Sequence, residues 1–483
     1  MEELLKLLSE QMFKEAIDEL KSKRYIKEPE TDTVKNQLDP LKHEVFNRLK
    51  RPDKRVKIDP DDVNSNTINV TNENVQDGYR LEPVARIAFA LQKRIVNSAK
   101  SFVFGNPVKL NATPTNENEK AVLFALNRVL YDNKQKSLNR RVAQNLFSCT
   151  EVAELWYPVE TPNSVYGFDS KFKLKSIVLS PLLGDSLYPY FDDNGDMTAF
   201  SREFDVQVDG KTKSFFETYT ADFHYMWVSG SNGYELVEGY PKPNAIKKIP
   251  VVFGNQDQPE WADVQGLIER LEKLLSNFAD TNDYHASPKI FVQGGIKGFA
   301  KKGESGAILE GEEGATAQYL SWANAPESVK LEIDTLLRMI HSITQTPDTS
   351  FDMVKGIGSI SGVALKLLFM DAHLKVKDHQ EVLDEYLQRR INIIKAYIGE
   401  FNTKLKKDAE NLMVEPVIIP YMIEDKAADI KMWVDANGGN PVISQKASFQ
   451  MAGLTSDSEA DFEQFKTEQS EKSAFTFNEP TNV

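Results

Sequence analysis

The sequence contains a single cysteine, Cys149, among its 483 residues. One cysteine excludes an intrachain disulfide and any thiolate metal cluster made by one subunit. Its neighbours in QNLFSCTEVAELWY predict a buried structural thiol. No stretch reaches the roughly 20 uninterrupted apolar residues of a membrane span, and the amino terminus lacks the regions of a signal peptide. We therefore expect a soluble, cytosolic chain without a membrane partner.

Basic residues are also scarce. The 58 Lys and Arg against 72 Asp and Glu give a formal net charge of −14. This sign disfavours tight nucleic-acid binding, because such affinity comes from basic side chains that release counterions from phosphates. Passing contact with DNA inside a mainly acidic passage stays compatible with the composition.

Catalytic motifs are absent. GGIKGFAKKGES has glycines and lysines without the spacing of a phosphate-binding loop, and no H-E-x-x-H, G-x-S-x-G or Cys/His zinc pattern occurs. His373 and His379 are six residues apart and fall on different faces of a helix. Asp192 and Asp193 are adjacent in a turn-like context and do not form an acid/base pair. We predict no catalytic residues, no metal and no cofactor.

The chain is long enough for two to four domains, and 41% hydrophobic with 10% aromatic residues argues against disorder. The first 25 residues have the spacing of one amphipathic helix. The basic stretch NRLKRPDKRVKIDPDD is interpreted as a solvated linker, because acidic residues follow it. A second helix is predicted from Pro83 to the stop signal FGNP.

Residues 150–255 change to a strand pattern. Alternating apolar residues are interrupted by Asn194-Gly195 and Asp209-Gly210, which favour tight hairpin turns. We predict an antiparallel sheet. The DDNGD segment lacks the later glutamate of an EF-hand, so a turn is favoured over a calcium site.

Two long amphipathic helices are predicted next, over 259–286 and 326–346, each opening with Pro-Glu. The insert between them, 287–325, is rich in glycine and contains the strand-like KIFVQ and AQYLSW. This arrangement predicts a small mixed module at the tip of a helical hairpin.

The segment SFDMVKGIGSISGVALKLLF, residues 350–369, combines glycines with apolar side chains and then continues into a strong helix former. Its first half is too glycine-rich for a helix and too apolar for an ordinary solvated loop. Almost forty residues without proline follow and predict one long helix. The C-terminal region is predicted to be helical, with its last dozen residues disordered.

Four stretches in the correct order resemble the SPP1-like (Gp6-like) family of bacteriophage portal proteins. LKHEVFNR near 42–48 resembles an N-terminal His-x-[apolar]-x-x-Arg element, although the usual preceding tyrosine and glycine are missing. RIVNSAKSFVFGNPVKL resembles a wing helix that ends in Gly-x-Pro. RMIHSITQTPDTSFDMVKGIGSISGVALK resembles the end of a stem helix with its tunnel loop. VISQKASFQMAGLTSDSEADFEQFKTE resembles the crown motif, with Lys446-Ala447 in place of the more usual threonine.

The resemblance implies an α+β portal fold with a mixed wing domain, long stem helices, a small α/β clip and a helical crown. The implied ranges are a wing over 1–258, to which 351–395 returns through the tunnel loop and long helix, stem helices over 259–286 and 326–349, a clip over 287–325, a crown over 396–472 and a disordered tail over 473–483.

The resemblance also explains the glycine-rich loop, because tunnel loops line the narrowest part of a portal channel. On this interpretation Lys355 is the best candidate for transient phosphate contact, and a plain helix connector is the alternative. Acidic residues on the polar stem faces, such as Glu269, Glu272, Glu332 and Asp334, are candidates for the channel wall. The channel-facing residues implied are Phe351, Met353, Val354, Lys355, Gly356, Ile357 and Gly358.

The leading hypothesis is a ring, typically dodecameric, at one capsid vertex. It serves DNA packaging, genome retention and ejection, and head-to-tail connection, is assembled in the host cytoplasm and is not an enzyme. The implied partners are further copies of itself, the terminase motor, capsid and scaffolding proteins, adaptor proteins at the clip and double-stranded DNA. The alternatives are a non-portal assembly or scaffolding protein, and a metal-dependent hydrolase that uses Asp192 and His224.

Overall fold

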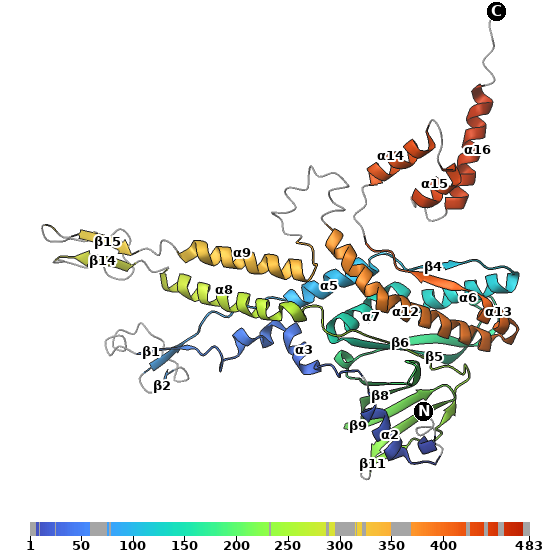
Figure 1. The fold of residues 1–483 in the computed structure, drawn as a ribbon, viewed down its shortest axis with the longest axis horizontal. Helices are drawn as coiled ribbons and strands as arrows, with labels where there is room; N and C mark the ends of the chain where they lie inside the picture. Colours follow the sequence, from blue (N-terminus) through green and yellow to red (C-terminus); the bar gives the residue numbers. More distant parts are fainter. Residues whose placement is uncertain are drawn as a thin grey trace, which may run out of the picture. The chain divides into compact units, whose positions relative to one another are not determined.

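The structure is a computed structural model, drawn in Figure 1. The chain divides into two compact units. The first comprises Met1–Pro347 with Asp371–Tyr421, and the second comprises Asp348–Met370 with Met422–Val483. The residues that the structure describes are 6–8, 10–24, 26–57, 75–76, 79–230, 233–285, 289–294, 314, 316–320, 325–348, 369–421, 426–438, 443–452 and 458–476.

The N-terminal segment is helical but not one helix. A helical turn ends at Gln11, whose φ of 59° is left-handed, and Met12 N–H donates to Leu7 O as in a Schellman turn. Helix α2 (Phe13–Ser22) then packs Ile17 and Leu20 against strands of the largest sheet. The prediction of a single helix over residues 1–25 is therefore wrong. α3 (Thr31–Leu38) and two 3-10 turns, η1 (Pro40–Lys42) and η2 (Glu44–Phe46), follow.

Helices form the main core of the first unit. They are α5 (Leu91–Phe104), α6 (Glu117–Asp132), α7 (Gln135–Cys149), α12 (Met370–Phe401), the 3-10 turn η7 (Thr403–Leu405) and α13 (Lys406–Asn411). α12 confirms the long helix predicted after the glycine-rich loop. The predicted start of α5 at Pro83 is wrong, because residues 83–90 are not helical.

Antiparallel sheets account for residues 151–255, as predicted. The largest sheet has the order β11-β10-β9-β8-β7, with β12 paired to β10, and a smaller one has the order β13-β5-β6. Gly195 and Gly210 have φ of 84° and 73° in the predicted hairpin turns. The strands are β5 (Glu151–Asn163), β6 (Ser170–Leu179), β7 (Ser186–Phe191), β8 (Met197–Val208), β9 (Lys211–Thr220), β10 (Phe223–Gly230), β11 (Gly233–Leu236), β12 (Lys242–Pro243) and β13 (Val251–Asn255), with the turn η4 (Pro181–Leu183) before β7.

Two small sheets connect distant parts of the sequence. β4 (Lys109–Ala112) pairs with β16 (Val414–Val417), and β1 (Lys54–Lys57) pairs with β3 (Tyr79–Glu82), which also pairs with β2 (Val75–Gln76). The basic stretch predicted to be a solvated linker therefore contributes a strand.

A buried ion pair fixes α12 to the smaller sheet. Arg390 Nε and Nη2 lie 2.8 and 2.7 Å from the two carboxylate oxygens of Glu154, and Arg390 Nη1 donates to Asn139 Oδ1 at 2.5 Å. Both charged side chains are almost fully buried. The bidentate geometry satisfies the charges that burial removes from water.

The predicted helical hairpin is confirmed by α8 (Gln265–His285) and α9 (Ala325–Ile343), which lie side by side in Figure 1. α8 begins six residues later than predicted, because a 3-10 turn, η5 (Ala262–Val264), precedes it. Between the helices, β14 (Lys289–Gln293) pairs antiparallel with β15 (Thr316–Leu320), at the two predicted strand sequences.

The second unit contains α14 (Lys426–Asn437), α15 (Gln445–Ala452) and α16 (Ser458–Thr476). Ser444 Oγ accepts from Ala447 N–H at the start of α15, and Phe449 contacts Phe462 and Phe465. α16 extends into the segment 473–483 that was predicted to be disordered, which corrects that prediction up to Thr476.

Candidate functional site

The candidate site is the helical hairpin with its supports at the base. Ile268 and Leu271 of α8 and Leu336 and Ile340 of α9 are buried in the main core. One exposed ion pair joins the helices, with Arg270 Nη2 at 2.7 Å from Glu332 Oε1. The hairpin is therefore closed mainly by apolar burial.

The segment that precedes α5 is held along α8 by side-chain acceptors. The N–H groups of residues 85, 87 and 89 donate to Asp280 Oδ1, Ser276 Oγ and Glu272 Oε1 at 2.8, 3.0 and 2.9 Å. Every second residue of this extended segment therefore bonds to every fourth residue along one face of α8. These bonds explain why residues 83–90 do not join the helix predicted there, since their amide groups are satisfied by α8.

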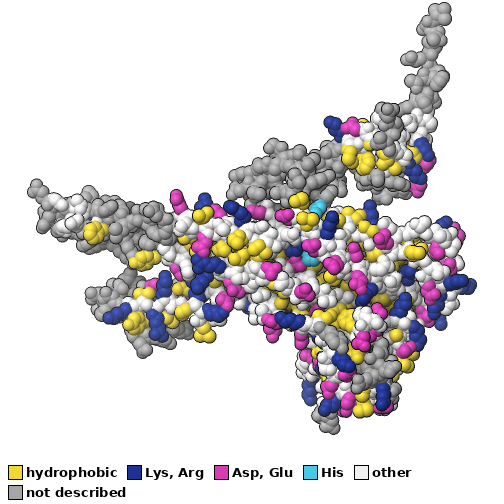
Figure 2. Space-filling view, viewed as in Figure 1, with side chains coloured by type: hydrophobic (Ala, Val, Ile, Leu, Met, Phe, Trp, Pro, Cys, Tyr) yellow, Lys and Arg dark blue, Asp and Glu magenta, His cyan; other side chains and the backbone are white. Residues whose placement is uncertain are grey.

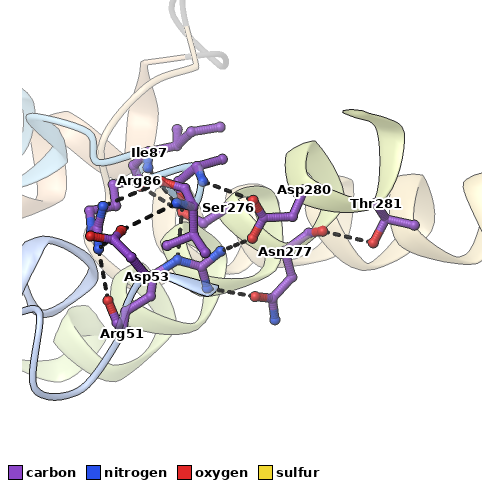
Figure 3. A network of polar contacts seen from close by, with 10 residues as sticks. Arg51, Asp53, Arg86, Ile87, Ser276, Asn277, Asp280 and Thr281 are labelled. Atoms are coloured by element: carbon purple, nitrogen blue, oxygen red, sulfur yellow. Dashed lines mark hydrogen bonds and ion pairs between the residues drawn. The ribbon is translucent and has the colours of Figure 1, made fainter. Parts of the chain in front are cut away.

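Arg51 and Arg86 complete this support, as Figure 3 shows. Arg51 Nη2 lies 2.5 Å from Asp280 Oδ2, and Arg51 Nη1 donates to Asn277 Oδ1 at 2.7 Å. Arg86 Nη2 lies 2.7 Å from Asp53 Oδ1 and also donates to Arg51 O. The hydrogen bond from Arg86 lowers the pKa of Asp53. Arg51, from the basic stretch, therefore binds α8 directly.

His43, from the N-terminal element of the portal resemblance, forms a buried pair with α8. Its Nδ1 lies 2.8 Å from Glu272 Oε1, and its Nε2 lies 2.8 Å from Gln37 O. Burial alone would lower the pKa of His43, but the bonds to Glu272 and to the Gln37 carbonyl raise it. Since Glu272 is 1% exposed and paired within the subunit, its prediction as a channel-wall residue is wrong. Glu332 is half-buried in the pair with Arg270, and Asp334 is exposed.

A second cluster, called the Glu260 cluster here, joins the start of the hairpin, the end of α9 and the first turns of α12. Lys375 Nζ lies 2.5 Å from Glu260 Oε2 and donates to Thr344 O at 2.9 Å, and His379 Nε2 lies 3.4 Å from Glu260 Oε1. Burial would raise the pKa of Glu260, but contact with His379 and Lys375 outweighs it and lowers the pKa to about 2. The carboxylate is therefore charged near neutral pH.

The predicted channel-facing residues, Phe351, Met353, Val354, Lys355, Gly356, Ile357 and Gly358, lie outside the described residues. The chain is described up to Asp348 and again from Phe369. The Glu260 cluster ties these two flanks together through the bond from Lys375 to Thr344 O.

The Glu260 cluster was not among the predicted sites. Lys375 and His379 are four residues apart on one helix face, which is a usable signal for a shared acidic partner. His373, the other histidine nearby, is six residues from His379 and was predicted to lie on a different face of the helix. In the structure His373 contacts the ring of Phe102, and His379 stacks on Phe147 at 4.2 Å.

The glycine of the predicted wing-helix motif has a packing role. A Cβ on Gly105 would lie 2.5 Å from Ser101 O and 2.8 Å from Tyr421 Cβ. The Tyr421 N–H donates to Phe102 O at 2.8 Å. The absence of a side chain thus allows the chain after β16 to approach the end of α5.

The residues of the hydrolase alternative have structural contacts. Asp192 Oδ1 accepts from the N–H groups of Asn194 and Asp196 and so forms the β7–β8 turn. His224 stacks on Tyr219 and lies 3.3 Å from Glu217 Oε2. Within the part of the chain that the structure describes, no three His, Cys, Asp or Glu residues are grouped to hold a metal. Cys149 is buried as predicted, and burial raises the pKa of its thiol to about 11.

No helix in the described segments has the length and apolar character needed to cross a membrane.

Comparison with known proteins identifies the family. The phage portal protein family of SPP1 Gp6-like type matches residues 63–474. No curated protein sequence matches the chain. Among solved structures, the neck of an empty GTA particle computed with C6 symmetry is 11% identical, with a TM-score of 0.41 over 75% of this chain and 90% of that chain. The neck of a native GTA particle computed with C12 symmetry is 10% identical, with a TM-score of 0.38 over 75% and 88%.

The family match spans most of the chain, including α8, α9 and α12, and confirms the portal resemblance and the α+β fold class. It also removes the hypothesis of a non-portal assembly protein. The chain therefore belongs to the SPP1 Gp6-like family of phage portal proteins.

Proposed function

We propose that copies of this chain form a ring, typically of twelve, at one vertex of a phage capsid. Double-stranded DNA enters through the central channel during packaging, is retained there and later leaves through it. The terminase motor supplies the energy, and this chain performs no catalysis. Membership of the portal family supports this proposal.

The ranges implied by the portal resemblance become domain proposals. Residues 1–258 with 351–395 form the wing, 259–286 and 326–349 the stem, 287–325 the clip, 396–472 the crown and 473–483 the tail. The clip contacts adaptor proteins that connect head and tail, while capsid and scaffolding proteins surround the ring during assembly in the host cytoplasm.

The observation that carries the proposal is the Glu260 cluster. Lys375 binds the turn directly after α9 through Thr344 O and the start of the hairpin through Glu260. The described flanks of residues 349–368 are therefore tied together at one ionic cluster. Such a fixed frame suits a loop that contacts moving DNA, because motion in the loop is then not passed on to the hairpin.

We propose that residues 351 and 353–358 face the channel, with Lys355 making transient phosphate contacts. Replacing both Gly356 and Gly358 by alanine is expected to impair DNA packaging and leave ring assembly intact, because alanine restricts the backbone conformations open to glycine. DNA packaging is measured as nuclease-protected DNA in an assembly reaction. Normal packaging by this double variant would contradict a role for the glycines in the loop.

Electron microscopy of the purified full-length protein tests the ring directly. Class averages with rotational symmetry and a central hole wide enough for a DNA duplex are the expected result. Because scaffolding proteins close some rings, the experiment is repeated with scaffolding protein present. Particles that remain monomers or dimers under both conditions would overturn the proposal.

A further inference from the structure

Two helices of the first unit carry positive charge without one acidic residue. The formal net charge of the chain is −14, and acidic and basic side chains are intermingled over the face of the first unit seen in Figure 2. Helices α5 and α7 depart from this mixture, since neither contains Asp or Glu. Their basic residues are Lys93, Arg94, Lys100, Lys136, Arg140 and Arg141.

α5 and α7 pack against each other, and a lysine joins them at the surface. Lys100 Nζ donates to Asn97 Oδ1 on its own helix at 2.8 Å and to Gln144 Oε1 on α7 at 2.7 Å. Both acceptors are neutral amide oxygens, so the charge of Lys100 is not cancelled. Burial and the nearby Arg140 guanidinium lower the pKa of Lys100, which confirms that like charges lie close together here.

The remaining basic side chains of this surface are exposed. Lys93, Lys136, Arg140 and Arg141 are all exposed, and none of them forms an ion pair with any described residue. Like charges without counter-charges create a positive potential that an anion would relieve. The surface therefore contrasts with the net negative charge of the whole chain.

The surroundings of these charges distinguish a phosphate ligand from a protein partner. No large hydrophobic side chain of α5 or α7 is exposed, and the polar residues between the charges include Asn97, Ser101, Ser137 and Gln144. Protein interfaces have an apolar centre, which neither α5 nor α7 supplies. The exposed Phe124 and Tyr131 of α6 share a groove with Lys136 and Ser137, at the start of α7 only. Contacts to DNA phosphates use Lys and Arg together with Ser, Asn and Gln side chains.

Strand β6 offers a contrast within the same unit. Lys171, Lys173 and Lys175 alternate along it, so they share one face of the sheet. That face also exposes Ile177, with Tyr157 paired opposite Lys175. β6 is an edge strand, where lysines commonly prevent pairing with other chains.

We propose that the exposed face shared by α5 and α7, called the α5–α7 surface, binds the phosphate backbone of duplex DNA without sequence specificity. Its contacts are Lys93, Lys100, Lys136, Arg140 and Arg141. The presence of DNA beside the protein rests on the proposed portal function. Binding is weak at physiological salt, because the rest of the chain is acidic and the contacts are purely electrostatic.

Fluorescence anisotropy of the full-length protein with a labelled duplex of about 30 base pairs tests this surface. The triple variant Lys136→Gln, Arg140→Gln and Arg141→Gln is expected to bind at least tenfold more weakly at about 50 mM salt. For the triple variant, the slope of log affinity against log salt concentration should be smaller in magnitude by roughly 2 to 3. Each lost phosphate contact removes about 0.9 from that slope.

The matched control is Lys171→Gln, Lys173→Gln and Lys175→Gln, which removes the same charge from β6. Its affinity should stay within about twofold of the wild type, because it leaves the α5–α7 surface intact. Circular dichroism checks that both variants remain folded. Equal losses in the two variants would mean that net charge alone governs binding, and the proposal would be wrong.

Two further results would overturn it. The first is no detectable binding by the wild type at low salt. The second is displacement of the duplex by polyglutamate of equal charge as readily as by unlabelled DNA, which would indicate an acidic protein partner. Ring formation is scored separately by electron microscopy. Rings without DNA binding contradict this inference alone, and DNA binding without rings contradicts the proposed function alone.

Discussion

The two helices of the hairpin are both amphipathic but differ in their surroundings. α8 is covered on one side by α9 and on another by residues 84–90, which bond to Glu272, Ser276 and Asp280. α9 packs against α8 and leaves Leu331, Met339 and Ile343 exposed at 67%, 46% and 48%. α8 is thus anchored within its own subunit by buried polar contacts, and α9 is held mainly by its apolar stripe.

The two helices are therefore stabilised in different ways, α8 by contacts within the subunit and α9 with an apolar side left over. Each buried polar contact of α8 requires a specific partner and fixes one position of the helix. The exposed apolar side of α9 gains nothing in the single subunit, since its side chains remain in water. In a ring, such a side is available to another copy, which agrees with the proposed function.

The largest loss of stability is expected when the buried polar contacts of α8 are removed. Glu272→Ala leaves the His43 Nδ1 and the Phe89 N–H buried without their acceptor, and removal of one partner from a buried pair costs about 3 to 5 kcal/mol. Urea denaturation of the purified subunit measures the loss. Glu332→Ala, which removes the exposed pair of α9 with Arg270, is the matched control and should cost about 0 to 1 kcal/mol. Similar losses in both variants would contradict the comparison.

A smaller and pH-dependent effect is expected at the Glu260 cluster, where both helices meet α12. The folded pKa of Glu260, about 2, lies below its ordinary value of 4.5. The charged carboxylate therefore stabilises the fold fully above about pH 4.5, and its contribution is lost as the pH falls toward 2. Each pKa unit corresponds to about 1.4 kcal/mol, so Glu260→Gln should cost about 3 kcal/mol at pH 7.

Denaturation of the wild type and Glu260→Gln across pH 3 to 7 checks this prediction. The difference in the free energy of unfolding between the two proteins should narrow as the pH falls below about 4.5. Asp334→Asn, at an exposed residue of α9, serves as a control whose difference stays small at every pH. A gap for Glu260→Gln that stays constant down to pH 3 would show that charge on Glu260 is not what stabilises the cluster.

The hairpin itself could be predicted from the sequence, because apolar residues at helical spacing and Pro-Glu starts are local signals. The start of α5 could not. Residues 83–90 have helical periodicity, but their amide groups bond to Asp280, Ser276 and Glu272, which lie almost 200 positions later. Local propensity is overridden where a distant side chain offers the backbone a better partner.

The same limit applies to the charges of the candidate site. Glu272 lies on α8, and its sequence neighbours Lys273 and Glu269 give no hint that it is buried. Only the fold brings His43 to it. Arg51 was part of a basic stretch whose acidic neighbours favoured a solvated linker, yet its partner is Asp280 on α8. Pairs formed by residues far apart in the chain are thus the part of the site that sequence patterns miss.

The smallest effect on the isolated subunit is expected on the outer side of α9. Leu331→Ser with Met339→Ser should change its free energy of unfolding by less than about 1 kcal/mol, because both side chains are largely exposed and the main loss is in helix propensity. The same variant should reduce ring formation, since a neighbouring copy would lose apolar surface to bury.

Phe124→Ser with Tyr131→Ser, at exposed residues of α6, controls for general loss of surface hydrophobicity. Mass photometry at equal protein concentrations compares the three proteins. Full ring formation by the α9 variant would show that its exposed side is not an assembly surface, and the contrast between the helices would then concern the subunit alone.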